Sequence, residues 1–170
     1  MSPQLPQETA PSSNTFLDAS GRVLDLDAVL GLVYDFVTKK PEAQYQIIVG
    51  TDSHASDEVS FVTAITVRRV GNGGIYFWTR SYKKQFPSLR DRMYAEAISS
   101  IMLAEELRGR LKDILHEDYF WNDQIHIDIG ENGKTKDLID GIVGMVRGYG
   151  FEAVIKPFAF GASAVADRHT

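Results

Sequence analysis

The residues of this sequence that could carry chemistry are acidic and lie in four separate segments. They are Asp52 in GTDSH, Glu96 in a long amphipathic stretch, Asp128 in IHIDIG and Asp167 in VADRH. An ionised carboxylate that leaves water loses much of its hydration energy, so a cluster of such groups needs cations beside it. If the four segments converge, these acids predict a site for a divalent cation, Mg²⁺ or Mn²⁺.

Two of these acids can be tested against the pattern around them. Asp52 follows an apolar run, as a residue at the end of a central strand would, although TDS is also a sequence that caps turns. At about 100° per residue, Glu96 lies at the edge of the apolar stripe of its helix, whereas Glu105 points away from it. We therefore expect Glu96 to face inward, with a surface position at the edge of the stripe as the alternative.

The third acid belongs to an alternating strand sequence, IHIDI. Its isoleucines share one face, and His126 and Asp128 share the other, which a solvent-facing pair would also explain. The same spacing of carboxylate and imidazole recurs at Asp52–His54 and Asp167–His169. These pairs could form a mixed centre for Mn²⁺, Fe²⁺ or Zn²⁺. We prefer histidines that orient the carboxylates or face solvent, with His169 as the best candidate for a proton shuttle or outer ligand.

The net charge of −5 is unlike that of a bulk nucleic-acid binder, so phosphate contact would have to be local. One local candidate is the stretch 80–92, which could equally be a solvated strand end and helix start. Its basic residues are Arg80, Lys83, Lys84, Arg90 and Arg92, with Tyr82 and Phe86 interleaved. Ser53 and Lys134 are further candidates for positioning a nucleic-acid backbone.

The segment GENGKT at 130–135 resembles a nucleotide-binding loop but fails its spacing. The G-x-x-x-x-G-K-T motif would require glycine where Asp128 stands. A helix that began near Gly133 could still direct backbone N–H groups and Lys134 at a phosphate.

Length and composition favour one globular domain over residues 16–170. The 170 residues are 44% apolar and 24% charged, which is ordinary for a domain with a sizeable core. Residues 1–15 are rich in Pro, Ser, Gln and Thr, which predicts a disordered tail. The sequence has no cysteine, no signal peptide and no apolar run of membrane length, so we expect a cytoplasmic protein that does not contact the membrane.

Periodicity predicts an N-terminal helix followed by the order β-β-β-α-β-α-β-α. The glycine-rich sequence GNGG at 71–74 predicts a hairpin between the second and third strands. The expected segments are a turn or hairpin in 16–24, a helix from Leu26 to Val37 capped by Asp25, strands 44–53, 59–70 and 75–82, a helix 89–115, a strand 124–130, a helix 133–150, a strand 151–158 and a short final helix in 161–170.

With this order of elements, the motifs VGTDSH, IHIDIGENGKT and SAVADRHT resemble the ribonuclease H-like superfamily, and closely the YkuK-like family of bacterial proteins. The resemblance covers about residues 16–170. It implies an α/β (mixed α+β) fold with a five-stranded mixed sheet, its first three strands antiparallel, flanked by helices. By analogy with active members it also implies a nuclease with two metal ions. Only this resemblance singles out Asp167, which otherwise could be a cap near a fraying terminus.

The leading hypothesis is therefore a metal-dependent nuclease that hydrolyses phosphodiester bonds in DNA, RNA or a hybrid. Asp52, Glu96, Asp128 and Asp167 would hold two ions of Mg²⁺ or Mn²⁺. The alternative is an inactive ribonuclease H-fold module that binds nucleic acid or protein, and a third hypothesis is a small-molecule phosphohydrolase. The aromatic strand residues Tyr76 and Trp78 are expected to be exposed, which would permit a homodimer.

Overall fold

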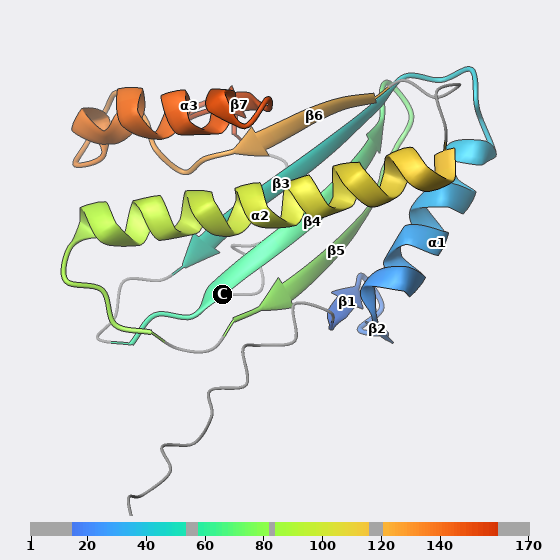
Figure 1. Cartoon of the computed structure of the whole chain (residues 1–170), viewed down its shortest axis with the longest axis horizontal. Helices are drawn as coiled ribbons and strands as arrows, with labels where there is room; N and C mark the ends of the chain where they lie inside the picture. Colours follow the sequence, from blue (N-terminus) through green and yellow to red (C-terminus); the bar gives the residue numbers. More distant parts are fainter. Residues whose placement is uncertain (1–14, 54–57, 82–83, 116–120, 160–170) are drawn as a thin grey trace, which may run out of the picture.

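The computed structural model describes residues 15–53, 58–81, 84–115 and 121–159. Its strands form one mixed sheet in the order β2-β1-β5-β4-β3-β6-β7 (Figure 1). The bounds are Phe16–Asp18 (β1), Val23–Leu24 (β2), Tyr45–Ser53 (β3), Phe61–Arg69 (β4), Gly74–Arg80 (β5), Trp121–His126 (β6) and Glu152–Val154 (β7). Within the sheet, β3, β4 and β5 are antiparallel neighbours, while β6 runs parallel to β3 and β7 parallel to β6.

The five strands expected from the sequence are present, although the strand expected at 124–130 is β6 at Trp121–His126, and two more strands extend the sheet. The predicted hairpin at 16–24 forms β1 and β2, and β1 adds to β5 through the pairs Leu17–Trp78 and Asp18–Phe77. Between β4 and β5, Gly71 and Gly73 adopt φ of 82° and 81°, which other residues rarely tolerate. The glycine-rich turn thus fixes the register of the long β4–β5 hairpin.

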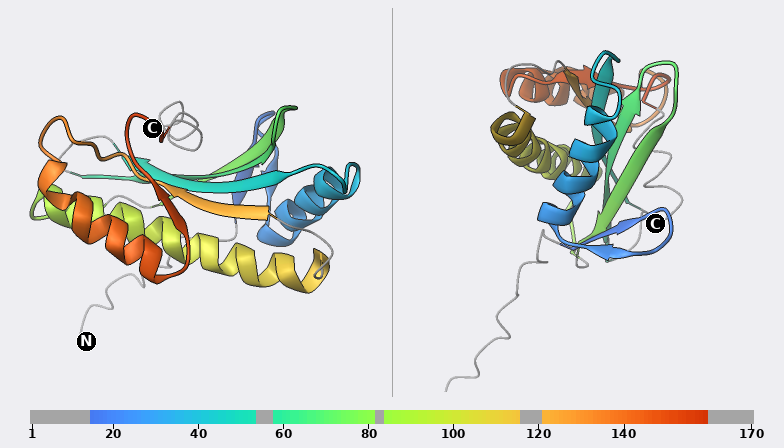
Figure 2. Two further views of the ribbon diagram at one scale, coloured as in Figure 1. Left: turned by 90° about the horizontal axis from the view of Figure 1, so that it is seen from above. Right: turned by 90° about the vertical axis from the view of Figure 1, so that its right-hand side faces the viewer.

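The described helices lie on one face of the sheet (Figure 2). They are α1 (Leu26–Thr38), α2 (Leu89–Leu115) and α3 (Ile139–Gly148), with a short 3₁₀ helix at Lys136–Leu138. Their apolar faces join alternate strand residues in one core that includes Ile47, Ile65 and Ile125. This burial, rather than helix propensity, supplies most of the stability of such a layer.

Helix α1 follows its sequence signals closely. The Asp25 side chain accepts a hydrogen bond from the Ala28 N–H at 2.8 Å, as an N-cap does. The expected inward residues Val29 and Val33 are fully buried. The cap and the apolar stripe together set where α1 begins and how it packs.

Helix α2 spans the residues predicted for it, with one error at its end. Leu107 and Leu111 are buried as expected, but Ile114 is 38% exposed and Leu115 takes the inward position instead. A helix has 3.6 residues per turn, so a stripe followed over several turns drifts around the helix axis. By the C-terminal end of α2, this drift is enough to turn Leu115 toward the core in place of Ile114.

The later elements begin and end differently from the sequence prediction. The expected helix at 133–150 begins only at Lys136–Leu138, because Gly133 adopts φ of 109°, which lies outside the helical range. Strand β7 is shorter than 151–158, since Pro157 has no N–H to donate to a ladder. The predicted tail at 1–15, apart from Thr15, and the predicted final helix at 161–170 lie outside the described residues. Among the described helices, none is long and apolar enough to cross a bilayer.

Candidate active site at the carboxyl end of the central strands

Asp52 lies in β3, and Asp128 lies two residues beyond the end of the neighbouring parallel strand β6. In the register of this pair, Gly50 faces His126, and each acid lies two residues further along its own chain. Both acids therefore lie at the carboxyl edge of the sheet, where β3 and β6 end. Asp52 is 7% exposed, and its Oδ1 accepts the Ser53 N–H at 2.8 Å.

Glu96 reaches this edge from α2, whose N-terminal half passes the ends of β3 and β6 (Figure 1). Its side chain is 4% exposed, so the predicted inward orientation is confirmed, and Glu105 is exposed as expected. The Ser53 hydroxyl donates a short hydrogen bond to Oε1 of Glu96. Ser53 therefore holds the carboxylate against the end of β3.

One turn after Glu96, a buried hydroxyl cluster fixes α2 to the sheet. The Thr51 hydroxyl lies 2.7 Å from the Ser100 hydroxyl and 2.9 Å from the Thr63 hydroxyl, which joins α2, β3 and β4. Buried polar groups that satisfy one another specify a single docking position. This contact positions Glu96 relative to Asp52 and was not expected from the sequence.

Electrostatics show that the three acids interact. The pKa of Glu96 is raised to about 8, chiefly by burial; the charges of Asp52 and Asp128 also raise it, while the Ser53 hydrogen bond and the charge of Arg92 lower it. Arg92 lies one turn before Glu96 on α2 and adds a positive charge nearby. A buried carboxyl group whose pKa is raised in part by two other acids is typical of functional sites more than of structural ion pairs.

Asp128 has a partner that the sequence did not suggest. The Nζ of Lys156 lies 2.7 Å from its Oδ1, and both side chains remain partly open to solvent. The two residues meet because the chain beyond β6 and β7 continues side by side. The Ile127 N–H donates to the Val154 carbonyl and the Lys156 N–H to the Ile129 carbonyl, both at 2.9 Å. Lys156 thus provides a cation inside the acidic site.

His126 is buried rather than facing solvent. Its Nε2 lies 3.0 Å from the Oε1 of Gln124 on the same strand face. Burial lowers the pKa of His126 to about 4, and the nearby charge of Glu152 opposes the shift only in part. The imidazole is therefore neutral at physiological pH, which excludes it as a charged partner of Asp128 under those conditions.

The donor atoms at this edge fit a hard divalent cation. Carboxylate oxygens are the ligands that Mg²⁺ and Mn²⁺ prefer, and the interaction of Glu96 with two other acids leaves negative charge that a cation would neutralise. As they stand, however, no three His, Cys, Asp or Glu side chains in the described ranges lie close enough together to hold an ion. The Asp128–Lys156 pair accounts for part of this, since it engages one of the three acids.

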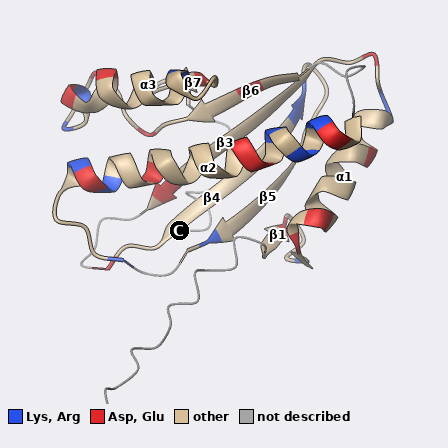
Figure 3. Cartoon of the chain, in the orientation of Figure 1, with Lys and Arg blue, Asp and Glu red and all other residues tan. Residues whose placement is uncertain are grey.

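The basic residues predicted to contact phosphate lie around the start of α2. Lys84 is exposed and its backbone pairs with Val59 across a β-bridge, and exposed Arg90 lies 5.2 Å from the centre of the Tyr94 ring. Lys134 is exposed in the turn before the 3₁₀ helix. Acidic and basic residues are interspersed along α2 (Figure 3), so its charges do not form a purely basic surface.

Several predicted residues lie outside the described part of the chain. These are His54, Lys83, Asp167 and His169. Their places in the site stay predictions. Tyr76 and Trp78, proposed as an exposed dimer surface, are both half-buried, so the premise of that proposal is wrong.

The geometry and sequence agree with comparisons against known proteins. A family model described as Ribonuclease H-like matches residues 28–170. The chain belongs to the ribonuclease H-like family. It is also 32% identical to "Uncharacterized protein YkuK" of Bacillus subtilis (strain 168), over 91% of this chain and 96% of that protein. No solved structure matches it.

Membership in the ribonuclease H-like family connects the fold to a broad class of function. Proteins with this fold generally use divalent metal ions and bind nucleic acid. The family thus suggests a nuclease-type or nucleic-acid-related function, whereas the relative's printed name assigns no activity.

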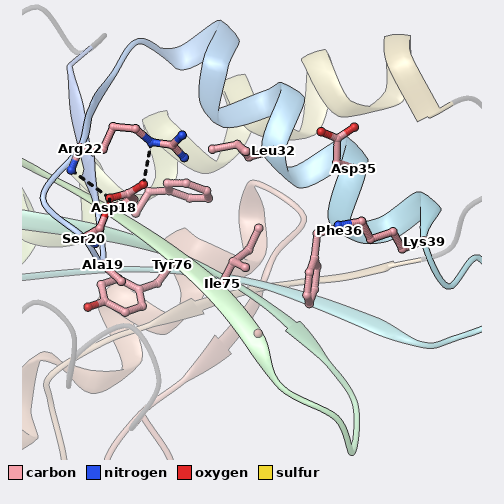
Figure 4. Close-up of a pocket in the computed structure, with 12 residues that line it drawn as sticks. Asp18, Ala19, Ser20, Arg22, Leu32, Asp35, Phe36, Lys39, Ile75 and Tyr76 are labelled. Atoms are coloured by element: carbon pink, nitrogen blue, oxygen red, sulfur yellow. Dashed lines mark hydrogen bonds and ion pairs between the residues drawn. The ribbon is translucent and has the colours of Figure 1, made fainter.

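A second region of the fold combines charged and apolar side chains but includes none of the predicted acids. A cavity of about 460 Å³ lies between the β1–β2 hairpin, α1 and β5 (Figure 4). Asp18 and Arg22 form an ion pair at 3.0 Å on one wall, and Phe36 and Tyr76 contribute rings. The acidic site and this cavity therefore use separate sets of residues.

Proposed function

We propose that this protein is a divalent-metal-dependent nuclease that hydrolyses phosphodiester bonds of nucleic acid. The observation that carries the proposal is the electrostatic interaction of Glu96 with Asp52 and Asp128, three acids delivered to one edge of the sheet by α2, β3 and the end of β6. Asp167 would complete the ligand set. Two ions of Mg²⁺ or Mn²⁺, when bound, would lower the pKa of a water and neutralise charge on the phosphate.

The residues of the chain have separate tasks in this proposal. Ser53 holds Glu96 through its hydroxyl, and the Thr51–Ser100 contact keeps α2 in place, so the carboxylates are positioned before substrate arrives. Lys84, Arg90 and Lys134 are exposed and would contact phosphates along the strand, together with Lys83. His169 would move a proton near the scissile phosphate.

The test measures cleavage of labelled single-stranded, duplex, hybrid and branched substrates in Mg²⁺ and in Mn²⁺. We expect Asp52→Asn and Asp128→Asn each to reduce cleavage to the level without metal while the fold is retained. The matched control is Asp140→Asn, which makes the same change at an exposed acid on α3. Equal rates in the wild type and both site variants would refute the nuclease assignment.

A second candidate function is an inactive ribonuclease H-fold module that binds nucleic acid or protein. The ion pair between Lys156 and Asp128 favours it, because a resident ammonium group can neutralise an acid without any metal. Calorimetric titration with Mn²⁺ separates the two candidates when combined with the cleavage assay. Metal binding without turnover of any polymer would favour the module, and turnover of nucleotides alone would favour a small-molecule phosphohydrolase.

A further inference from the structure

A cavity of about 440 Å³ opens directly beside the Asp128–Lys156 ion pair. One wall is formed by Gly130–Asn132, which follow β6, and the other by Ile155–Phe158, which follow β7. Both walls continue strands that end at the acidic edge of the sheet. A ligand in this cavity would therefore lie next to the proposed reaction centre.

The two walls are held at a fixed spacing by their backbones. The Lys156 N–H donates to the Ile129 carbonyl at 2.9 Å, and the Phe158 N–H donates to the Ile155 carbonyl at the same distance. A Cβ on Gly130 would lie only 3.0 Å from Cβ of Lys156, so only glycine lets the walls approach this closely without displacing the lysine. The cavity is thus built from ordered backbone rather than from loose side chains.

Phe158 is the unusual residue of this cavity. Its side chain is 70% exposed, although its backbone is anchored by the turn that begins at Ile155. An aromatic ring on a fixed backbone offers a flat apolar face to solvent. Such rings stack with nucleic-acid bases at little cost in conformational entropy.

We propose that this cavity binds one unpaired nucleotide of a single-stranded nucleic acid, with the base stacked on Phe158 and an adjoining phosphate on the ammonium group of Lys156. The proposal rests on the proposed nuclease function and names its substrate class. The Lys156 side chain lines the cavity and remains partly exposed, so a phosphate oxygen can approach its ammonium group while the contact with Asp128 is kept. The bound phosphate then lies beside the acids.

The charges around the cavity define how a bound nucleic-acid strand is oriented. Glu131 lines the opposite wall and is exposed, so it repels a phosphate and leaves the Lys156 side as the favourable one. A base within a duplex is stacked between its neighbours and cannot offer a face to Phe158 without being flipped out. The cavity consequently favours single strands, of either RNA or DNA, over paired substrates.

The experiment measures fluorescence anisotropy of end-labelled single-stranded RNA, single-stranded DNA and the corresponding duplex with the full chain in EDTA. Binding is thus measured without hydrolysis, and the cleavage assay of Asp52→Asn decides the proposed function independently. We expect single strands to bind more tightly than the duplex. Phe158→Ala and Phe158→Leu should weaken single-strand binding by about 5- to 100-fold, while Phe158→Trp should retain it.

Two charge variants test the phosphate contact. Lys156→Gln should reduce the slope of log affinity against log salt by about 0.7, the value for one contact on a single strand. Glu131→Gln should strengthen binding at low salt. The control Tyr149→Ala removes an exposed aromatic ring outside the cavity and should leave affinity unchanged.

Three results would overturn the inference. The first is no measurable single-strand binding by the wild type, and the second is equal affinity in the wild type and Phe158→Ala. The third is an equal loss in Tyr149→Ala, which would indicate a nonspecific apolar effect. Because Phe158 and Tyr149 are exposed, circular dichroism should show the wild-type fold in each variant.

Discussion

Two carboxylates at different places in the sheet show opposite behaviour. Asp18, in the β1–β2 hairpin, accepts hydrogen bonds from the Ser20 hydroxyl at 2.7 Å and from the Arg22 N–H at 3.0 Å, and these contacts lower its pKa to about 2. Glu96, on α2, has a pKa raised to about 8, chiefly by burial. The surroundings of Asp18 stabilise its ionised form, whereas those of Glu96 favour its protonated form.

The origin of the partners explains the difference. Every hydrogen-bond donor to Asp18 named above lies within four residues of it, so the hairpin sequence alone provides the donors that stabilise its charge. Glu96 accepts a hydrogen bond from Ser53 and is repelled by the charges of Asp52 and Asp128, and all three residues come from distant segments of the chain. A carboxylate whose hydrogen-bond partners are all close in sequence typically has a structural role. Acids that come from distant segments and repel one another instead indicate a site for binding or catalysis.

The largest effect is expected for Glu96→Gln. If Glu96 binds metal, the variant should lose about a hundredfold or more in metal-dependent cleavage, a loss comparable to that of a key electrostatic group. Glu105→Gln makes the same change on the outer face of α2 and is the matched control. Cleavage by Glu96→Gln at the rate of Glu105→Gln would remove Glu96 from the proposed site.

The same variant should stabilise the metal-free fold. Glu96 ionises near pH 4.5 when unfolded but near 8 when folded, so its contribution to the free energy of unfolding falls as the pH rises between these values. At pH 8, Glu96→Gln should therefore be more stable by roughly 1–2 kcal/mol, or about 3–6 °C in Tm. Thermal unfolding in EDTA should show this gain disappearing below about pH 4.5.

His126 should make the free energy of unfolding change with pH in the opposite direction, and at lower pH. Its pKa is about 4 when folded and 6.5 when unfolded, so the unfolded chain binds the proton first as the pH falls. Metal-free wild type should lose roughly 1–2 kcal/mol through this residue between pH 6.5 and 4. Chemical denaturation across this range should show a shallower decline for His126→Gln, and parallel curves would contradict the assignment.

A smaller effect is expected at the ion pair beside the site. Lys156→Gln removes the cation that engages Asp128, so Mn²⁺ should bind about two- to fivefold more tightly, in keeping with a partly exposed ion pair. Isothermal titration calorimetry measures this change directly. Lys136→Gln is a control at an exposed lysine of the 3₁₀ helix, and an equal gain there would point to net charge instead.

The smallest effect is expected at the structural acid. Asp18→Ala removes the hydrogen bonds that close the hairpin, so Tm should fall slightly, and the difference from wild type should narrow as the pH falls from 3.8 toward 2. Cleavage rate and Mn²⁺ affinity should be unchanged. A loss of cleavage as large as that of Glu96→Gln would mean that the two regions are not independent.

Much of the fold could be predicted from local patterns. Three local patterns predicted features that the structure confirms. The isoleucines of IHIDI are buried, the apolar stripe of α2 faces the core, and the glycines at 71–74 form the turn of a hairpin. The addition of β1 to the edge strand β5 could not be predicted in this way, because backbone pairing between distant segments leaves little trace in side-chain pattern.

The site was predictable only in part. Helical phase placed Glu96 inward, as the structure confirms, whereas Asp128, expected within a strand opposite the isoleucines, lies beyond the end of β6. Lys156 was missed, because nothing in the sequence VIKPF relates it to Asp128, which lies 28 residues earlier. The predicted start of the helix near Gly133 was also wrong, since the positive φ of this glycine, which the sequence does not reveal, is not helical.

The sequence by itself determined which segments form helices and strands, and which face of each is apolar, because these properties depend on residues a few positions apart. Only the tertiary structure decided that Glu96 lies in the field of Asp52 and Asp128, that Ser53 and Ser100 fix α2, and that Lys156 enters the acidic site. Charges and hydrogen bonds act through distances in space. Those distances are set when the helices pack on the sheet.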